Sequence, residues 1–446
     1  MRKLTIMLTA LFLFLISPVI SAEENDKNFY YYIMIDRFQI GSLEEENIDM
    51  DDPLAHHGGD FAGIINRLDY LKTLGVTHII LSPIFESDSF TGFENVNYDQ
   101  IQPTFGTEEE LSNLVKKFND EGIEVILHFP IDESALPLSE IVSVIEQWVN
   151  KLSIAGIYLQ TDEDISNDFY ESVRKVLNNK LFIGHTNQVG NEDELLSLGF
   201  DKIVSPMFQQ IGVDLFSGKD KSVELLNSNE LYDERIVHYL ELYDTDRFAN
   251  QVNDIGYHPV THWKLALTYL MTIPNDLIIY QGSEVALGGF KEDNSNNQMM
   301  TFLTGDDQII RLIEKISDAN KRRDSLAKGN FDILHAEDGY FVYIRTFEDE
   351  STLVAINLSD TIQHAEINLD PNLEFRGMLL NDLVRENEDG TYIVTLKREE
   401  SNVFVVQQDT GIYWPMVLVF LGVMAIFVTF IVVMSRKNKK EQKSSS

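Results

Sequence analysis

Several apolar segments of this 446-residue chain end at a polar residue that could take part in chemistry. His128, His185 and Asp244 lie at three such ends, and two imidazoles with one carboxylate are a reasonable ligand set for Zn²⁺ or another divalent metal. The same side chains could instead form a hydrogen-bonded cluster without a metal, or be unrelated to one another. Gln160 lies at a fourth end, and its amide can form hydrogen bonds but cannot act as a nucleophile.

The elements that would position these residues alternate regularly along the chain. Short β-rich runs cover residues 29–36, 78–84, 124–130, 156–160, 181–185, 202–207, 235–242 and 276–282, and helical patterns follow them, the last near 306–325. Apolar strands that alternate with amphipathic helices indicate a parallel sheet covered by helices. Eight such units predict an α/β fold, a closed (β/α)₈ TIM barrel over residues 23–329, whose chemistry lies at the C-terminal ends of the strands.

Both ends of the chain carry further segments. From residue 330 to 408, strand-like runs such as YFVYIRTF and TLVAINLS are separated by turn signals, which predicts a small antiparallel β domain. Residues 413–434 are apolar enough to cross a bilayer as a transmembrane helix, and residues 435–446 form a basic tail on its cytoplasmic side. Residues 1–22 have the pattern of a signal peptide. We therefore expect a single-pass type I protein of the cell membrane with an extracellular ectodomain.

The composition excludes some functions. The chain has no cysteine, so disulfides, thiol nucleophiles and Cys-ligated zinc are ruled out. A cysteine-free ectodomain fits a Gram-positive cell surface. The formal net charge of −37 argues against nucleic-acid binding. The acidic residues at 44–52 could supply oxygen ligands for Ca²⁺, but EF-hand spacing is absent and a solvated loop explains the composition as well.

From residue 29 to about 405, the sequence resembles the α-amylase family, glycoside hydrolase family 13. The segments that carry the resemblance are HHGGDFAGIINRLDYLKTLGVTHIILSPIFES (56–87), MIDRF (34–38), GFENVNYDQIQPTFGT (92–107) and LMTIPNDLIIYQGSEVAL (270–287). The predicted β domain is similar to the C-terminal domain of the family. The resemblance implies a shared barrel, but most of these residues belong to the scaffold and not to the chemistry.

The catalytic positions of the family are changed in this chain. The resemblance places Gln160 where the family has its nucleophilic Asp and His185 where it has its acid Glu. His128 replaces the Asp of the third-strand signature and Tyr243 replaces the His of the seventh, whereas Asp244 keeps the Asp that contacts sugar hydroxyls. The domain that the family usually inserts after the third strand is also missing. The sequence is thus identified as a divergent member with degraded catalytic signatures.

Some residues could still bind a sugar. The resemblance suggests Phe93, Tyr98, Asp244 and Arg247 as candidate contacts, because aromatic rings can cover a sugar face and the polar groups can bond its hydroxyls. Alternatively, all four hold the barrel mouth together by packing or ion pairing.

These changes predict a membrane-anchored extracellular protein that is inactive as a glycoside hydrolase. It would bind an α-glucan or a cell-wall glycan, or act as the partner subunit of another membrane protein. One alternative is an active α-glucan hydrolase that uses carboxylates outside the family positions, such as Glu133, Asp162 or Glu163. Another is a new metal-dependent site formed by His128, His185 and Asp244, with His56 and His57 on a nearby loop. A surface scaffold with no ligand is a further possibility.

Overall fold

The computed structural model describes residues 27–42, 48, 50–303, 306–409, 411 and 414–444. The predicted signal peptide therefore lies outside the described residues, as do residues 44–47 and 49 of the acidic loop that could bind Ca²⁺.

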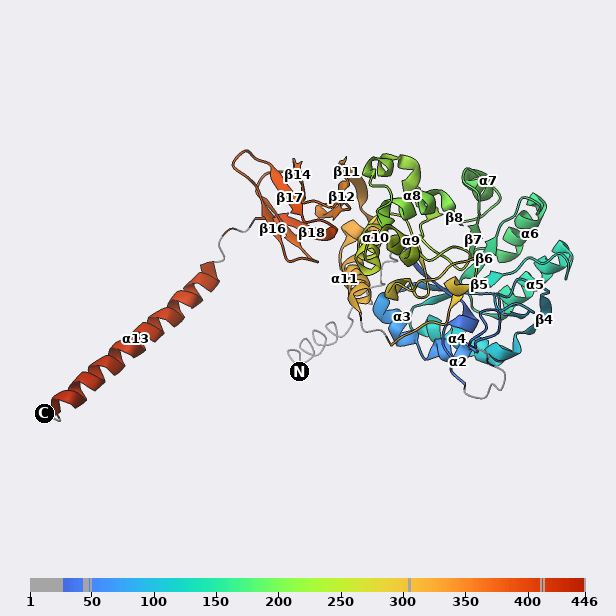
Figure 1. Ribbon diagram of the computed structural model, residues 1–446, viewed down its shortest axis with the longest axis horizontal. Helices are drawn as coiled ribbons and strands as arrows, with labels where there is room; N and C mark the ends of the chain where they lie inside the picture. Colours follow the sequence, from blue (N-terminus) through green and yellow to red (C-terminus); the bar gives the residue numbers. More distant parts are fainter. Residues whose placement is uncertain are drawn as a thin grey trace, which may run out of the picture.

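Eight parallel strands form the barrel (Figure 1). In chain order these are β1 (Phe29–Ile33), β2 (His78–Leu81), β5 (Glu124–Phe129), β6 (Gly156–Gln160), β7 (Leu181–His185), β8 (Lys202–Val204), β9 (Ile236–Val237) and β10 (Leu277–Tyr280). They pair in the order β10-β1-β2-β5-β6-β7-β8-β9, and a parallel bridge between His238 and Leu277 joins β9 to β10. The predicted (β/α)₈ fold is confirmed.

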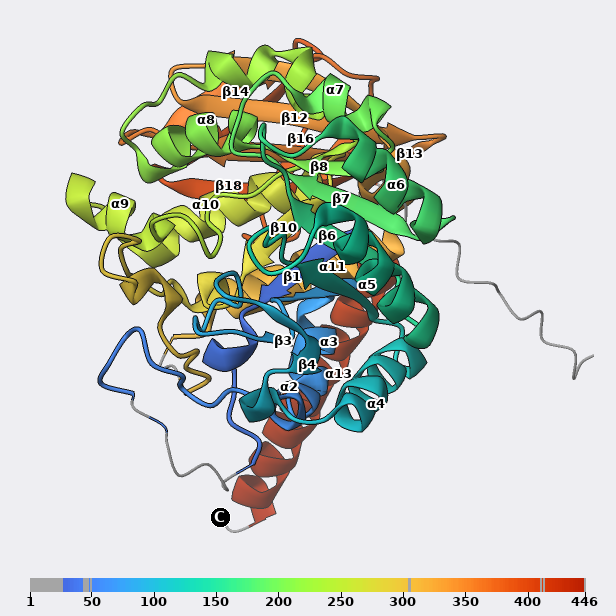
Figure 2. The same cartoon turned by 90° about the vertical axis from the view of Figure 1, so that its right-hand side faces the viewer.

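Helices cover the outside of the barrel (Figure 2). They are α2 (Phe61–Ile65), α3 (Leu68–Leu74), α4 (Glu108–Asp120), α5 (Leu138–Lys151), α6 (Asn167–Leu177), α7 (Glu192–Ser197), α8 (Pro206–Ser217), α9 (Phe248–Ile255), α10 (Pro259–Thr272), α11 (Gln308–Arg322) and α12 (Asp324–Lys328). Local sequence explains where such a helix begins. At α4, Thr107 accepts a hydrogen bond from the backbone of Glu110, whose side chain bonds back, and this capping box satisfies two free N–H groups.

Strand β1 shows how the barrel separates two cores. Side chains of a strand alternate between its faces. Tyr30 and Tyr32 point into the barrel, whereas Phe29, Tyr31 and Ile33 pack outward in the layer between strands and helices. The interior is unusually aromatic as a result, since both inward positions of β1 are tyrosines.

The connection between β5 and β6 is short. Only α5 lies between Phe129 and Gly156, so the structure has no inserted domain at this point. A small antiparallel hairpin, β3 (Phe85–Glu86) with β4 (Asn97–Ile101), lies earlier in the chain. The mouth of the barrel therefore lacks one wall that the family resemblance would otherwise imply.

The C-terminal domain is an antiparallel β structure, as predicted. Its strands are β11 (Asn330–Glu337), β12 (Tyr340–Phe347), β13 (Glu350–Asn357), β14 (Gln363–Ile367), β15 (Leu373–Gly377), β16 (Leu383–Arg385), β17 (Tyr392–Leu396) and β18 (Glu400–Gln408). Six of them form one sheet in the order β11-β12-β13-β18-β15-β16, and β14 pairs with β17. The domain contacts α10 of the barrel, where Arg345 Nη1 donates to the carbonyl of Thr272 at 2.7 Å.

A long helix, α13 (Trp414–Ser444), follows the β domain and extends away from it in Figure 1. Its window Val417–Met434 is long and apolar enough to cross a membrane, and none of that window is buried against the protein. Length and composition alone support this reading.

Candidate functional site

The C-terminal ends of β5, β6 and β7 meet at one mouth of the barrel. In the strand register Gln160 lies opposite His185, and His128 lies opposite Tyr158. The predicted convergence of the strand-end residues is thus present in the structure.

Six ring side chains fill the centre of this mouth. We call them the aromatic plug: Tyr32, Phe93, His128, Tyr158, His185 and Tyr243. The Tyr243 ring stacks on Tyr32 with centroids 5.0 Å apart and on Phe93 with centroids 5.7 Å apart. Every member except Phe93 is buried. Side chains therefore fill the C-terminal end of the barrel, where TIM-barrel enzymes have their active sites.

Hydrogen bonds hold the plug in one arrangement. The Tyr243 hydroxyl donates to Gln160 Oε1 at 3.1 Å, and the Tyr32 hydroxyl pairs with His128 Nδ1 at 2.8 Å. Gln160 is half-buried and contacts the plug through its carbonyl oxygen. Its amide nitrogen is left to make other contacts.

Burial favours the neutral form of the two histidines of the plug. Burial lowers the pKa of His128, and the nearby His185 lowers it further. Burial also lowers the pKa of His185, although Asp244 acts in the opposite direction. A neutral buried imidazole cannot serve as the charged partner of a carboxylate at neutral pH. Asp244 is half-buried, and one of its oxygens is buried with no hydrogen-bond partner among the described residues.

The metal hypothesis is not supported. Within the described residues, no group of three or more His, Asp or Glu side chains is placed so that it could hold a metal ion, and that includes His128, His185 and Asp244. The loop histidines have another role: His56 Nδ1 lies 3.1 Å from Asp36 Oδ1, and the His57 backbone donates to the same carboxylate. The two loop histidines are thus held against Asp36.

Tyr98 is a structural residue and not an exposed sugar contact. It is buried, its hydroxyl donates to the Pro130 carbonyl at 2.9 Å, and it accepts from the Asp132 backbone at 3.0 Å. Although burial acts to raise the pKa of Asp132, hydrogen bonds from Ser134 and Val96 hold it below its ordinary value. Asp132 therefore stabilises this loop as a carboxylate.

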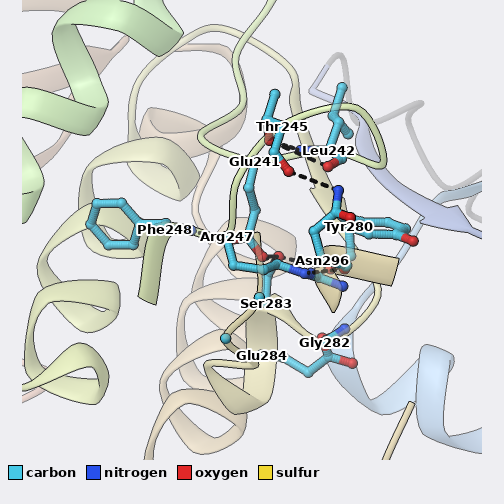
Figure 3. Close-up of polar contacts among 12 residues, drawn as sticks. Glu241, Leu242, Thr245, Arg247, Phe248, Tyr280, Gly282, Ser283, Glu284 and Asn296 are labelled. Atoms are coloured by element: carbon cyan, nitrogen blue, oxygen red, sulfur yellow. Dashed lines mark hydrogen bonds and ion pairs between the residues drawn. The ribbon is translucent and has the colours of Figure 1, made fainter. Parts of the chain in front are cut away.

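Arg247 is also structural, which corrects its assignment as a candidate sugar contact. Its side chain is fully buried, and Nη1 forms an ion pair of 2.8 Å with Glu241 (Figure 3). Nε donates to the Asn296 carbonyl at 2.7 Å, and the guanidinium lies over the Tyr280 ring. Ser283 completes the cluster with a bond of 2.8 Å to Glu241. These contacts tie the loops after β9 and β10 together.

Two adjoining cavities lie beside the plug. One, of about 480 Å³, is lined by Phe93 and Gln160 and by the candidate carboxylates Glu133 and Asp162. The other, of about 380 Å³, lies between the loops after β6 and β7 and includes Glu163. Both are lined by Thr161, Asp162, Asp164, Ile165 and Asn187. Because the two cavities share these five lining residues, we treat them together and call them the side groove.

Sequence reasoning missed part of this site. Asn187, Gln188 and Asn191 line the side groove but were not candidates. A signal existed, because all three follow directly on the end of β7, where barrel proteins place functional loops. No sequence signal indicated that the Tyr243 ring fills the barrel centre, because the position of this ring depends on packing between segments that are distant in the sequence.

Two family profiles match the chain. The one described as "Alpha amylase, catalytic domain" matches residues 32–135, and the one described as "Alpha-amylase C-terminal domain" matches residues 329–404.

Among similar proteins is the Beta/alpha-amylase of Paenibacillus polymyxa, 25% identical over 85% of this chain but only 38% of its own length. Alpha-amylase 2 of Dictyoglomus thermophilum is 24% identical, over 75% of this chain and 70% of that protein. The solved structure of an Anoxybacillus α-amylase superposes with a TM-score of 0.78 and 27% identity, covering 87% of this chain and 99% of the other. The described barrel and β domain are thus similar to the Anoxybacillus α-amylase structure over nearly the full extent of that protein.

Proposed function

Because the chain belongs to the α-amylase family, glycoside hydrolase family 13, we propose that it binds carbohydrate at the outer face of a cell membrane without hydrolysing glycosidic bonds.

The main support for this proposal is the identity of the residues at the barrel mouth. Retaining hydrolysis needs two carboxyl groups about 5–5.5 Å apart. At the two positions that the family resemblance assigns to them, the chain has the amide of Gln160 and the buried imidazole of His185, and the Tyr243 ring lies against both residues. Loss of a nucleophile alone costs on the order of 10⁴-fold in rate in other covalent-catalysis sites. Neither family role can be filled here.

The membrane part of the proposal rests on sequence and on one helix. Residues 1–22 have a signal-peptide pattern, and α13 carries the apolar window Val417–Met434 followed by basic residues. Basic residues favour the cytoplasmic side of a span. In this orientation the barrel and β domain face the outside, where a cell-wall glycan, an α-glucan or a second membrane protein would be within reach.

A second candidate is an active α-glucan hydrolase. Two observations favour it: similar proteins are named as enzymes, such as the cyclomaltodextrinase of Thermoanaerobacter pseudethanolicus, and Glu133, Asp162 and Glu163 are exposed in the side groove. Exposed carboxylates can act on a sugar only if a pair is brought to the required spacing around it.

The test is to incubate the full-length protein in nanodiscs with maltoheptaose for days and to follow products by mass spectrometry. We expect no product beyond that of empty nanodiscs, together with measurable binding in calorimetry. Turnover that persists through repurification and is abolished by Asp162→Asn or Glu133→Gln would replace this proposal with the second candidate. If the protein shows no turnover and binds no glycan, the remaining interpretation is a surface scaffold with no ligand.

A further inference from the structure

The side groove differs from the barrel centre in being open. The rings of the plug are buried except for Phe93, which borders the groove together with the half-buried Gln160. The loop after β6 contributes Thr161, Asp162, Asp164 and Ile165 to the lining of both cavities of the groove. A ligand that cannot enter the axis could still lie along this loop.

The charge of the groove limits its ligand. Carboxylates line it at Asp132, Glu133, Asp162, Glu163, Asp164 and Glu194, and no Lys, Arg or His is among its described lining residues. An anionic ligand would meet like charges with no cation to pair with it, which costs free energy. No metal group is formed by the described carboxylates, so the groove is not explained as a cation site.

Gln160 sets a second limit on the chemistry of the ligand. The Tyr243 hydroxyl already donates to the carbonyl oxygen of this amide, whereas the described residues provide no acceptor for its Nε2 group, so Gln160 can offer these two donors to the groove. The ligand must therefore accept a hydrogen bond there, while the neighbouring carboxylates require it to donate. A hydroxyl group does both. An ammonium group would satisfy the carboxylates but could not accept from Gln160.

Amide side chains that can both donate and accept hydrogen bonds also line the cavity between the loops after β6 and β7. Asn187 is exposed and lines both cavities, so it can offer a donor and an acceptor. Asn191 donates to Thr186 Oγ1 at 3.0 Å, and its own carbonyl oxygen has no partner among the described residues. Gln188 is held by a hydrogen bond to Glu163. Two of the three amide side chains are thus held by neighbours, and Asn187 is exposed to the groove.

We propose that the side groove, and not the barrel axis, binds an uncharged, hydroxyl-rich oligosaccharide, with Gln160 as a fixed donor at one end and Asn187 near its middle. This inference rests on the proposed carbohydrate-binding function and names the ligand class and the place of binding. The groove selects against anionic glycans through its carboxylates.

Calorimetry on the full-length protein in nanodiscs tests the proposal with four probes. Two are neutral, maltoheptaose and N-acetylchitohexaose; two are charged counterparts, C6-oxidised maltoheptaose and fully deacetylated chitosan hexamer. We expect at least one neutral probe to bind, and the anionic C6-oxidised maltoheptaose to bind about tenfold more weakly than maltoheptaose or not at all. Gln160→Leu and Asn187→Ala should each weaken neutral binding by up to about tenfold, the effect of one hydrogen bond. Glu146→Gln, on the exposed face of α5, should change nothing.

The outcomes separate the two proposals. If a neutral probe binds but neither Gln160→Leu nor Asn187→Ala alters its affinity, carbohydrate binding stands and the groove assignment fails. Tighter binding of either charged probe overturns the ligand class. If no probe binds, the proposed function fails and this inference fails with it. Should Gln160→Leu not fold, as judged by circular dichroism, the exposed Asn187→Ala carries the test, and an unchanged affinity there overturns the groove assignment.

Discussion

Tyr243 and Gln160 are bonded to each other across the barrel mouth, with the phenol donating to the amide carbonyl at 3.1 Å. The first follows β9 and the second ends β6. Both stand at positions that the family resemblance assigns to sugar contact or sugar cleavage. In this chain the hydroxyl of Tyr243 and the amide of Gln160 bond to each other. The ring of Tyr243 packs between Tyr32 and Phe93 and fills the barrel mouth.

Replacement of Tyr243 by Phe tests this relationship. The Tyr243→Phe ring can keep its stacking on Tyr32 and Phe93, but the bond to Gln160 is lost. We expect the free energy of unfolding to fall by about 0.5–1.5 kcal/mol, the usual net value of one such bond. Denaturant unfolding followed by near-UV circular dichroism measures it. Tyr239→Phe is the control, because the described residues give the Tyr239 hydroxyl no side-chain bond; an equal loss there would contradict the assigned bond.

Removal of the Arg247 charge should destabilise the barrel strongly. Arg247→Met leaves Glu241 buried without its ionic partner, although Ser283 and the Phe248 backbone still donate to it. Breaking a buried pair in this way costs about 3–5 kcal/mol. Arg311→Met is the matched control, since its pair with Asp307 is exposed and should be worth at most about 1 kcal/mol. Equal stabilities of the two variants, with weakened glycan binding only in Arg247→Met, would restore Arg247 as a sugar contact.

The sequence predicts the strands and helices of the barrel well because local residue patterns determine where they lie. The bounds 156–160 and 181–185 agree with β6 and β7 residue for residue, since each is a short apolar run between helical segments. The predicted run at 235–242 shortens to Ile236–Val237, because the chain then turns into the loop that holds Glu241 and Tyr243. Pattern alone could not show this turn, which depends on contacts with the loop after β10.

Side-chain roles at the mouth were harder to predict. The sequence shows that His128, His185 and Asp244 end neighbouring elements, but not that the rings of Tyr158 and Tyr243 each pack against both histidines. Which of two polar residues faces solvent also depends on distant partners. Arg247 is buried by Glu241 and Asn296, whereas Asn187 is exposed, and nothing in either local sequence distinguishes them.

Acid should destabilise the fold through its buried histidines. Burial lowers the pKa values of His128 and His185, and lowers that of His238 to about 3. In the unfolded chain these imidazoles take up a proton below about pH 6.5, while the folded protein does not. The unfolded state thus binds more protons, so the free energy of unfolding falls as pH drops below about 6.5. Each histidine contributes a slope of about 1.4 kcal/mol per pH unit.

His238→Phe isolates one of these contributions. The His238 ring stacks on Phe208 at 4.2 Å with the planes 2° apart, and Phe can keep that contact. Denaturant unfolding from pH 8 to 4.5 should show a slope shallower by about 1.4 kcal/mol per pH unit in the variant below pH 6. At pH 8 the imidazole is neutral in both states, so the difference in the free energy of unfolding between the two proteins reports packing alone and serves as the internal reference. Parallel curves for the two proteins would mean that His238 is protonated in the folded state.

Removal of the C-terminal helix should release the protein from the membrane. The window Val417–Met434 has no contacts that bury it in the protein, so its apolar surface needs another environment. Expressed in a Gram-positive host, the full chain should sediment with membranes and resist carbonate extraction. A chain that ends at Gly411 should appear folded in the medium. A chain that ends at Arg436, without the remaining basic tail, is the control and should stay in the membrane fraction. If the chain ending at Gly411 still sediments with membranes, the barrel or β domain itself binds the membrane or a partner in it, and α13 is not the sole anchor.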